Sequence, residues 1–483
     1  MSEISLKEKT TKGLFWGGMS NGIQQLLNLF FGIFLARLLS PGDYGMVGML
    51  TIFSSIAGSL QEAGFISALI NRKEDRHEDY NAVFWFSICM SFCLYLILFF
   101  CAPLIARFFH TPELTKLARF VFIGFFISSF GISQSAYLSK HLMIKQKAIA
   151  SIISLFISGI VGITMAFKGF TYWGLATQSI VNILIGTVLC WIMSPWRPSS
   201  KISVTPIAQM LPFSIKILLT NVSYHINNNL FSIILGRFYT KEEVGNFTQA
   251  NKWHNLSYSL ISGIVSSVSQ PVLASVNKDC ERQLRIFRKM VRFTAFVSFP
   301  LMFGLSMIAP EFITIAITDK WMNSAEILRI LCIAGAFIPI SNLFSSLLIS
   351  QGKSETYMWG NVVLCLFQIV VMVTLHNFGI RAMVIFYSGF NFMWMWVWYM
   401  LVRKRTNYRL WYFAFDILPY LIIALAVMLT TYFITKPIRN TCYLLLSRVI
   451  LAFILYTITM RISNADIFKE VTEQFRHWIM KKQ

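Results

Sequence analysis

The stretch LARLLSPGDYG, residues 35–45, returns in altered form as LGRFYTKEEVG, residues 235–245. Leu, Arg and Gly recur at matching positions, and Ser-x-x-Asp in the first copy becomes Thr-x-x-Glu in the second. A Ser or Thr followed three positions later by an acidic residue is typical of the capping box that begins a helix. Each stretch is therefore predicted to form a corner between two helices.

The match extends upstream of the corner when the chain is compared with itself at an offset of 200 residues. Asn and Arg are scarce in apolar segments, so the polar identities carry more weight than the apolar ones. An accidental match between two similar turns is the alternative explanation. The identities between residues 21 and 45 are Asn21/Asn221, Asn28/Asn228, Phe31/Phe231, Ile33/Ile233, Leu35/Leu235, Arg37/Arg237 and Gly45/Gly245.

The composition excludes a soluble protein. Of 483 residues, 56% are hydrophobic and only 13% are charged, which leaves too little charge to cover the surfaces of several soluble domains. Apolar runs of about 18 residues or more recur along the chain, each long enough to cross about 30 Å of hydrocarbon as a helix. No loop between them is long enough to hold a folded soluble domain. The sequence therefore predicts an all-α polytopic membrane protein.

Fourteen transmembrane helices are predicted, centred near residues 25, 57, 94, 127, 157, 182, 224, 257, 300, 340, 365, 390, 423 and 450. Six spans separate the two copies of the corner, so both halves have the same orientation, as in the parallel repeats of some transporters. The predicted parts are an N-terminal lobe (1–200, helices 1–6), a C-terminal lobe (201–402, helices 7–12), two extra helices (403–462) and a cytoplasmic amphipathic tail (463–483).

The net charge of +21 is interpreted as a signal of topology, with no nucleic-acid partner. Most Lys and Arg residues fall in alternate loops and in the two terminal segments, which places both termini in the cytoplasm by the positive-inside rule. The first apolar stretch is too long for a cleavable signal peptide. The eight cysteines are scattered without a Cys-x-x-Cys spacing, so neither a metal site nor a disulfide framework is predicted, and no cofactor is expected.

Polar residues within the predicted spans are the candidate site. Such residues usually face a cavity or a partner, because burial in lipid is costly. The first and seventh spans carry matching stripes at helical spacing, which predicts two equivalent helices facing a central cavity; hydrogen bonds that only join helices are the alternative. The candidate substrate-binding residues are Asn21, Gln25, Asn28, Glu62, Asn221, His225, Asn228, Lys252 and His254.

Cationic groups in such a cavity suit an anionic ligand such as a phosphate or pyrophosphate. The leading cation is Lys252, which alternatively only pairs with Glu62. Arg448, in the last span, is either a cavity cation or the structural partner of a neighbouring carbonyl group. A basic segment at helical spacing either attracts a lipid headgroup or anchors the chain to the inner leaflet. Its members are Lys278, Arg282, Arg285, Arg288, Lys289 and Arg292.

The chain resembles the multidrug/oligosaccharidyl-lipid/polysaccharide exporter superfamily, in particular its Wzx-type repeat-unit flippases. The segment 13–50 carries the resemblance, above all ARLLSPGDYG at 36–45, with the glycine that follows the second span in QEAGF at 61–65. The resemblance implies two six-helix lobes around a central cavity, lined by the first, second, seventh and eighth helices, plus two extra helices. It also implies transport of an oligosaccharide linked to undecaprenyl pyrophosphate across the bacterial inner membrane by alternating access, for surface polysaccharide biosynthesis.

Other functions remain open at this stage. A drug exporter or a peptidoglycan-precursor flippase of the same superfamily would share the architecture. A major-facilitator transporter lacks support, because the loop NRKEDRHEDYN at 71–81 does not follow that family's usual pattern. A membrane enzyme of polysaccharide assembly would need a positioned base, and His225 and His254 have no nucleophile pattern beside them. The protein is therefore predicted not to be an enzyme.

Overall fold

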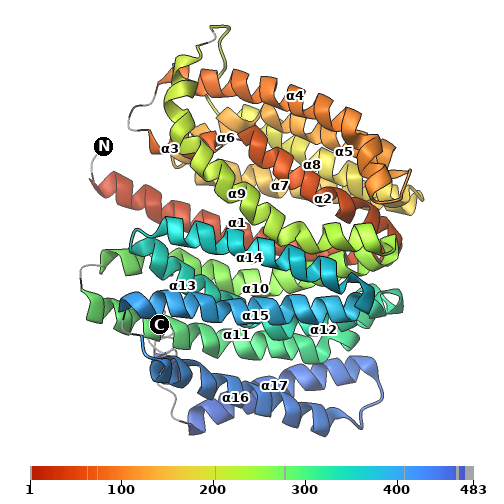
Figure 1. The fold of residues 1–483 in the computed structure, drawn as a ribbon, viewed down its shortest axis with the longest axis vertical. Coiled ribbons are helices and arrows are strands. Elements are labelled where there is room, and N and C mark those ends of the chain that lie inside the picture. Colours follow the sequence, from red (N-terminus) through yellow and green to blue (C-terminus); the bar gives the residue numbers. More distant parts are fainter. Residues whose placement is uncertain are drawn as a thin grey trace. The chain divides into compact units, whose positions relative to one another are not determined.

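The structure, a computed structural model, describes residues 3–62, 64–72, 74, 76–201, 203–276, 279–406, 408–463, 467–470 and 472–473. The described part of the chain consists of helices and short connections, with no strand (Figure 1). By contacts, the chain divides into two compact units, residues 1–245 and 246–483. The all-α fold is confirmed.

The first unit holds nine helices among its described residues and the first turn of a tenth. Long apolar stretches form them, and turns with Gly or Pro end several of them. They are α1 (Glu3–Leu38), α2 (Pro41–Glu62), α3 (Phe65–Asn71), α4 (His77–Phe108), α5 (Leu114–Ser129), α6 (Ile132–Lys140), α7 (Ile144–Phe167), α8 (Thr171–Met193) and α9 (Thr205–Phe238).

Close helix crossings hold the first unit together. The helix α1 packs on α7, α7 on α8, α4 on α5, and α9 on α2. A side chain at Gly159 of α7 would overlap the ring of Phe31 on α1, so only glycine permits this approach. Between α2 and α3, close to α9, Gly64 adopts a left-handed conformation with φ of 73°. A side chain there would meet the carbonyl oxygen of Ser214 on α9.

The second unit contains most of α10 and the rest of the chain. Its helices are α10 (Lys241–Ser275), α11 (Cys280–Ile317), η1 (Asp319–Trp321), α12 (Met322–Gly335), α13 (Ile338–Ser350), α14 (Ser354–Leu375), η2 (His376–Phe378), α15 (Ile380–Thr406), α16 (Leu410–Thr435) and α17 (Thr441–Ile462). The long helix α11 is central to the unit, because α12, α16 and α17 all pack against it.

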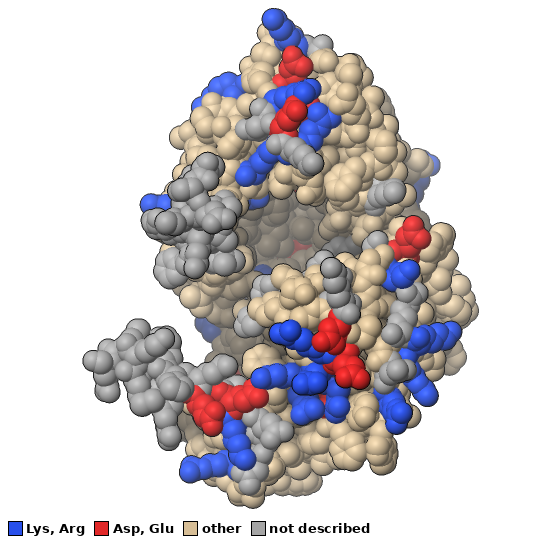
Figure 2. Space-filling view, turned by 90° about the vertical axis from the view of Figure 1, so that its left-hand side faces the viewer, with Lys and Arg blue, Asp and Glu red and all other residues tan. Residues whose placement is uncertain are grey.

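Many helices are suited to a membrane. Among the described residues, eight helical segments are long and apolar enough to cross one, and the bent pair α5–α6 makes a ninth if it counts as one span. Figure 2 shows the side that lies on the left in Figure 1, and Lys, Arg, Asp and Glu side chains are exposed on this face. A multi-pass membrane protein with charged helix ends fits both observations.

Ion pairs fix the last two helices to α11. Asp416 of α16 is 1% exposed and accepts from Arg288 Nε at 2.8 Å and from Arg292 Nε at 2.7 Å. Burial and the Asp416 carboxylate raise the pKa of Tyr408, and its hydroxyl donates to Asp416 Oδ2 at 3.1 Å. These contacts give two arginines of the predicted basic segment a structural partner. Lys278 of that segment lies outside the described residues.

Arg448 of α17 forms a second link to α11. Its Nη1 pairs with Glu311 Oε1 at 2.6 Å and donates to the carbonyl oxygen of Met307 at 3.3 Å. The guanidinium also lies over the ring of Tyr432. The interpretation of Arg448 as a structural partner of a neighbouring carbonyl is therefore the one that the contacts support.

Only part of the predicted tail can be described. Ile467 is 3% exposed, the ring of Phe468 contacts Phe296 of α11, and Glu470 pairs with Lys289 at 2.6 Å. Val471, Phe475 and Trp478, which follow Phe468 at helical spacing in the sequence of the predicted amphipathic tail, lie outside the described residues. The described residues of the tail are thus in contact with α11, and the amphipathic tail 463–483 stays a prediction.

We expect Asp416→Asn to lower the free energy of unfolding by about 3 kcal/mol, because it removes the charge that two partly buried arginines share. Thermal unfolding of the purified protein in detergent would measure the change. Glu470→Gln is the matched control: its ion pair with Lys289 is exposed, so the expected loss is about 1 kcal/mol or less. Equal melting temperatures for Asp416→Asn and the unmodified protein would contradict the assigned role.

Candidate functional site

Both corners of the sequence repeat are capping boxes, as predicted. At the first corner, Ser40 N donates to Asp43 Oδ2 at 2.9 Å, and Asp43 N donates to Ser40 Oγ at 3.3 Å. At the second corner, Thr240 N donates to Glu243 Oε2 at 3.1 Å, and Glu243 N donates to Thr240 Oγ1 at 3.3 Å. The same reciprocal pairing therefore starts α2 and α10, at the same offset of 200 residues.

The two corners touch each other through their glycines, within residues 1–245. A side chain at Gly45 would overlap the carbonyl oxygen of Lys241, and a side chain at Gly245 would overlap that of Pro41. Position 41 corresponds to 241 and position 45 to 245. The glycine of each copy therefore contacts the equivalent carbonyl oxygen of the other copy. Such reciprocity is the property of a two-fold interface. The chain thus repeats this junction because the two copies form one symmetric helix contact.

The polar stripes of α1 and α9 both lie in the first unit. On α1, Gln25 and Asn28 are half-buried and Asn21 is exposed. On α9, Asn221 and His225 are half-buried and Asn228 is exposed. The side-chain oxygen Oε1 of Gln25 is buried and has no hydrogen-bond partner among the described residues. These polar side chains lie in the middle of long helices without being sealed into the packed interior of the unit, and that they face a cavity stays a prediction.

The end of α2 shows how two adjacent polar residues differ. Gln61 is buried and exchanges hydrogen bonds with Ser128 of α5, at 2.9 and 3.1 Å, so it joins two helices. Glu62 is exposed, and Lys147 near the start of α7 acts on it electrostatically. Within the first unit, the candidate Glu62 therefore has a cationic neighbour that sequence reasoning did not identify.

Five long helices fall outside the apolar set. The helices α1, α2, α9, α10 and α15 are absent from the eight described segments that are apolar enough to cross a membrane by composition alone. The first four of them correspond to the first, second, seventh and eighth predicted spans, which the sequence resemblance implies as lining of a cavity. Helices with polar faces need surroundings other than lipid on those faces. That α1, α2, α9 and α10 line a transport path stays a prediction, because α15 shares the lower hydropathy.

Comparison with known proteins identifies the family. A family model described as polysaccharide biosynthesis protein matches residues 34–326, which is more than half of the chain. The chain belongs to this family. The match covers the duplicated corners and both capping boxes, and it confirms the resemblance to the polysaccharide-transporter branch of the superfamily.

Relatives and solved structures agree with this assignment. The lipopolysaccharide biosynthesis protein WzxC of Escherichia coli is 22% identical over 73% of this chain and 72% of its own length. The teichuronic acid biosynthesis protein TuaB of Bacillus subtilis is 24% identical over 75% and 76%. Among solved structures, the lipid II flippase MurJ covers 93% of this chain and 99% of its own, with a TM-score of 0.78 and 16% identity. A multidrug resistance MATE transporter of the MOP superfamily covers 80% and 94%, with a TM-score of 0.64 and 16% identity. The fold of this family member is thus that of MOP superfamily transporters.

The two candidates in the second unit have different surroundings. Lys252 of α10 is half-buried, and within its unit no described acidic side chain lies at ion-pair distance from it. His254 is 6% exposed, and its ring packs so closely on α12 that a side chain at Gly335 would overlap it. His254 Nδ1 lies 3.3 Å from Asn255 Oδ1, and Nε2 has no hydrogen-bond partner among the described residues. Lys252 is therefore the less buried of the two side chains.

Sequence reasoning missed the role of Arg237, one of the repeated residues. Its Nη1 donates to the carbonyl oxygen of Phe108, at the end of α4, at 2.7 Å and to His110 Nε2 at 2.6 Å. The identity of Arg37 and Arg237 was the available signal, but a repeated position does not reveal its tertiary partner.

Proposed function

We propose that this protein is a flippase that moves a lipid-linked oligosaccharide repeat unit across the bacterial inner membrane for surface polysaccharide biosynthesis. The observation that carries the proposal is the reciprocal contact between the two corners. It joins equivalent helices of a parallel repeat, next to stripes of polar residues on α1 and α9. Alternating access between the predicted lobes 1–200 and 201–402 requires such a contact to open and close.

The substrate in this proposal is an oligosaccharide on undecaprenyl pyrophosphate. Support comes from the names of the relatives: WzxC acts in lipopolysaccharide biosynthesis, TuaB in teichuronic acid biosynthesis, and the relative ExoT in succinoglycan transport. These polymers differ, and membrane export of a lipid-linked precursor is the step that a shared transporter fold could supply. Membrane lipids and other polysaccharide-assembly proteins are the further partners we infer.

The proposed orientation has both termini in the cytoplasm and the two corners at the outer face. The distribution of Lys and Arg along the sequence supports it. Polar contacts within the cavity would hold the sugars, and the cation Lys252 would hold the pyrophosphate. Family and fold match transporters, which supports a protein without catalytic activity of its own.

The fold likeness to MurJ gives a second candidate, a flippase of the peptidoglycan precursor lipid II. A drug exporter is the third, because a MATE transporter shares the fold. WzxC and TuaB, matched over more than two thirds of both chains, are named for lipopolysaccharide and teichuronic acid biosynthesis, and this favours the repeat-unit substrate.

Deletion of the gene from its host is expected to abolish the surface polysaccharide and to leave the cells viable. Lipid-linked oligosaccharide should accumulate on the cytoplasmic side, where periplasmic enzymes cannot reach it. Extraction of labelled lipid-linked sugars would measure the accumulation, and a plasmid copy of the gene should restore export. Lethality with accumulated lipid II would instead establish the peptidoglycan-precursor function, and drug sensitivity with normal polysaccharide would establish the exporter function.

A further inference from the structure

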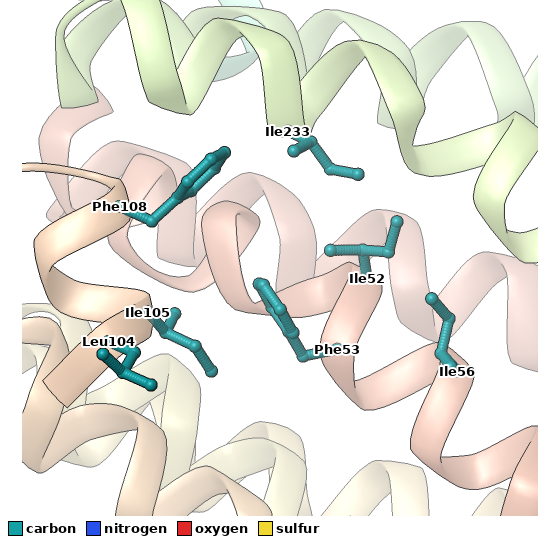
Figure 3. A pocket seen from close by; sticks show the side chains of 7 residues that line it. All are labelled: Ile52, Phe53, Ile56, Leu104, Ile105, Phe108 and Ile233. Atoms are coloured by element: carbon teal, nitrogen blue, oxygen red, sulfur yellow. The ribbon is translucent and has the colours of Figure 1, made fainter. Parts of the chain in front are cut away.

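An apolar pocket lies where α2, α4 and α9 meet in the first unit. Its volume is about 510 Å³, within the usual range for ligand pockets. Three lining residues come from α2 (Ile52, Phe53 and Ile56), three from the last turns of α4, and Ile233 from α9. All of these side chains are hydrocarbon, and Figure 3 shows them turned toward a common space. The pocket therefore suits an apolar chain.

The pocket opens where a lipid chain can reach it. Leu104 and Phe108, both on its wall, are 61% and 42% exposed. They belong to α4, whose length and hydropathy suit a membrane span, so we expect these exposed faces to meet hydrocarbon rather than water. A lipid tail can thus enter sideways from the bilayer.

A cationic rim adjoins the pocket. The guanidinium of Arg237 lies 5.2 Å from the centre of the Phe108 ring, so one residue is both pocket wall and arginine platform. Arg237 donates to His110 Nε2, which leaves the proton of a neutral His110 on Nδ1 as a further donor. Two donor side chains therefore stand at the outer end of α4, beside an apolar pocket.

We propose that this pocket binds one acyl chain of an anionic phospholipid, with the phosphate held by Arg237 and His110. Charge complementarity selects an anionic headgroup, since an arginine presents several donors to a phosphate. The volume fits a single acyl chain better than the several-fold longer undecaprenyl chain. Because the pocket joins α2 to α9, a bound chain would stabilise this arrangement of the two helices. The inference goes beyond the proposed transport function and does not depend on which oligosaccharide is carried.

The test uses the full-length protein in vesicles that contain phosphatidylglycerol with a photoactivatable group in one acyl chain. After illumination, mass spectrometry of peptides locates the adducts. We expect adducts to concentrate on 52–56 and 104–108 relative to Ile97 and Phe100, which are exposed on the same helix α4 but do not line the pocket. Adducts spread evenly over all exposed apolar residues would overturn the proposal.

Two pairs of variants separate the chain site from the headgroup site. Ile56→Trp, which fills the pocket, should reduce pocket adducts about ten-fold or more, whereas Ile97→Trp should not. Arg237→Gln should reduce the preference for phosphatidylglycerol over phosphatidylcholine about five-fold, whereas Arg107→Gln on the exposed neighbouring position should leave it unchanged.

Loss of pocket adducts when undecaprenyl phosphate is added would show that a polyprenyl chain is the occupant, and this would overturn the proposal. Size-exclusion profiles and melting temperatures would verify that each variant is folded, and adducts in a folded Ile56→Trp protein equal to those of the unmodified protein would also overturn it.

Discussion

Substitution of Gly45 or Gly245 by Ala is expected to abolish polysaccharide export while the protein remains in the membrane. An added methyl group at either glycine would overlap a carbonyl oxygen of the other corner, and backbone cannot move aside as a flexible side chain can. Overpacking of this kind costs about 1–3 kcal/mol. Because the overlapping atoms are backbone atoms, the overlap is removed mainly when the two helices move apart. A change of about 2 kcal/mol shifts the population of a two-state equilibrium more than ten-fold.

Matched glycines on the same helices provide the controls. A methyl group at Gly58 of α2 or at Gly263 of α10 meets no atom within 4 Å, so Ala should leave export unchanged at both positions. Surface polysaccharide and accumulated lipid-linked precursor would measure export, and immunoblots of membranes would measure protein levels. Full export by the Gly45→Ala variant would show that transport does not require the contact between the two corners.

The double variant Gly45→Ala/Gly245→Ala separates one shared contact from two independent defects. Once one methyl group has parted the corners, the second should cost little, so the double variant should resemble either single variant. A cysteine at Lys241, within the contact, should become more reactive to an impermeant thiol reagent in all three variants. Additive losses with unchanged reactivity would contradict a single symmetric contact.

Hydropathy and capping signals were enough to predict the long helices, although not the short helix α3. Each of the fourteen predicted centres lies within a helix or a broken helix pair of the structure. The boundary at the first corner was predicted because Ser40 and Asp43 have a local pairing that the sequence states directly. Local rules of this kind act within four residues, so they hold wherever the chain is placed.

Breaks within spans were not predicted. The fourth predicted span is the pair α5–α6, bent by 46°, and the tenth is the pair α12–α13. A hydropathy window averages over about 19 residues and does not detect a break that leaves the composition apolar. Gly131 and Pro339, which lie at the starts of α6 and α13, were the available signals.

Tertiary partners are the part of the structure that the sequence did not predict. Asp416 lies in an apolar helix more than a hundred residues from Arg288 and Arg292, and spacing on α11 alone suggested a lipid contact. Arg448 has Glu311 as its partner across a similar separation. Charges that are matched across the fold cannot be paired from a single sequence, because periodicity reports a face and not its neighbour.

The polar stripes illustrate the part of the site that a sequence can provide. Asn28 and Asn228 were identified because identical polar residues recur in otherwise apolar spans. The structure places them on α1 and α9 of one unit. Their role as ligands of the substrate stays a prediction, as does that of Glu62 and His254.

Lys252→Ala is expected to abolish export with unchanged protein levels, and Lys252→Arg is expected to restore part of it. A pyrophosphate that crosses the low-dielectric interior needs a compensating cation, and an unpaired buried charge costs several kcal/mol. Lys252 is half-buried on α10, one of the five long helices outside the apolar set, and no described acidic side chain of its own unit neutralises it. Lys289→Ala is the control, because that lysine has an exposed ion pair with Glu470.

The remaining alternative is that Lys252 only balances the charge of Glu62, and a second substitution distinguishes the two roles. If Lys252 binds the pyrophosphate, Lys252→Ala combined with Glu62→Gln should stay inactive, because neutralising the acid does not replace the missing cation. If the lysine serves only as a partner for Glu62, the neutral pair removes both charges and should recover export. If Lys252 only pairs with Glu62, Glu62→Gln alone should reduce export. If Lys252 binds the pyrophosphate, Glu62→Gln alone should leave export nearly unchanged, since Lys147 already acts on Glu62 within the first unit. Accumulation of lipid-linked oligosaccharide in each of the three strains measures the outcome, and full export by Lys252→Ala alone would remove this lysine from the substrate path.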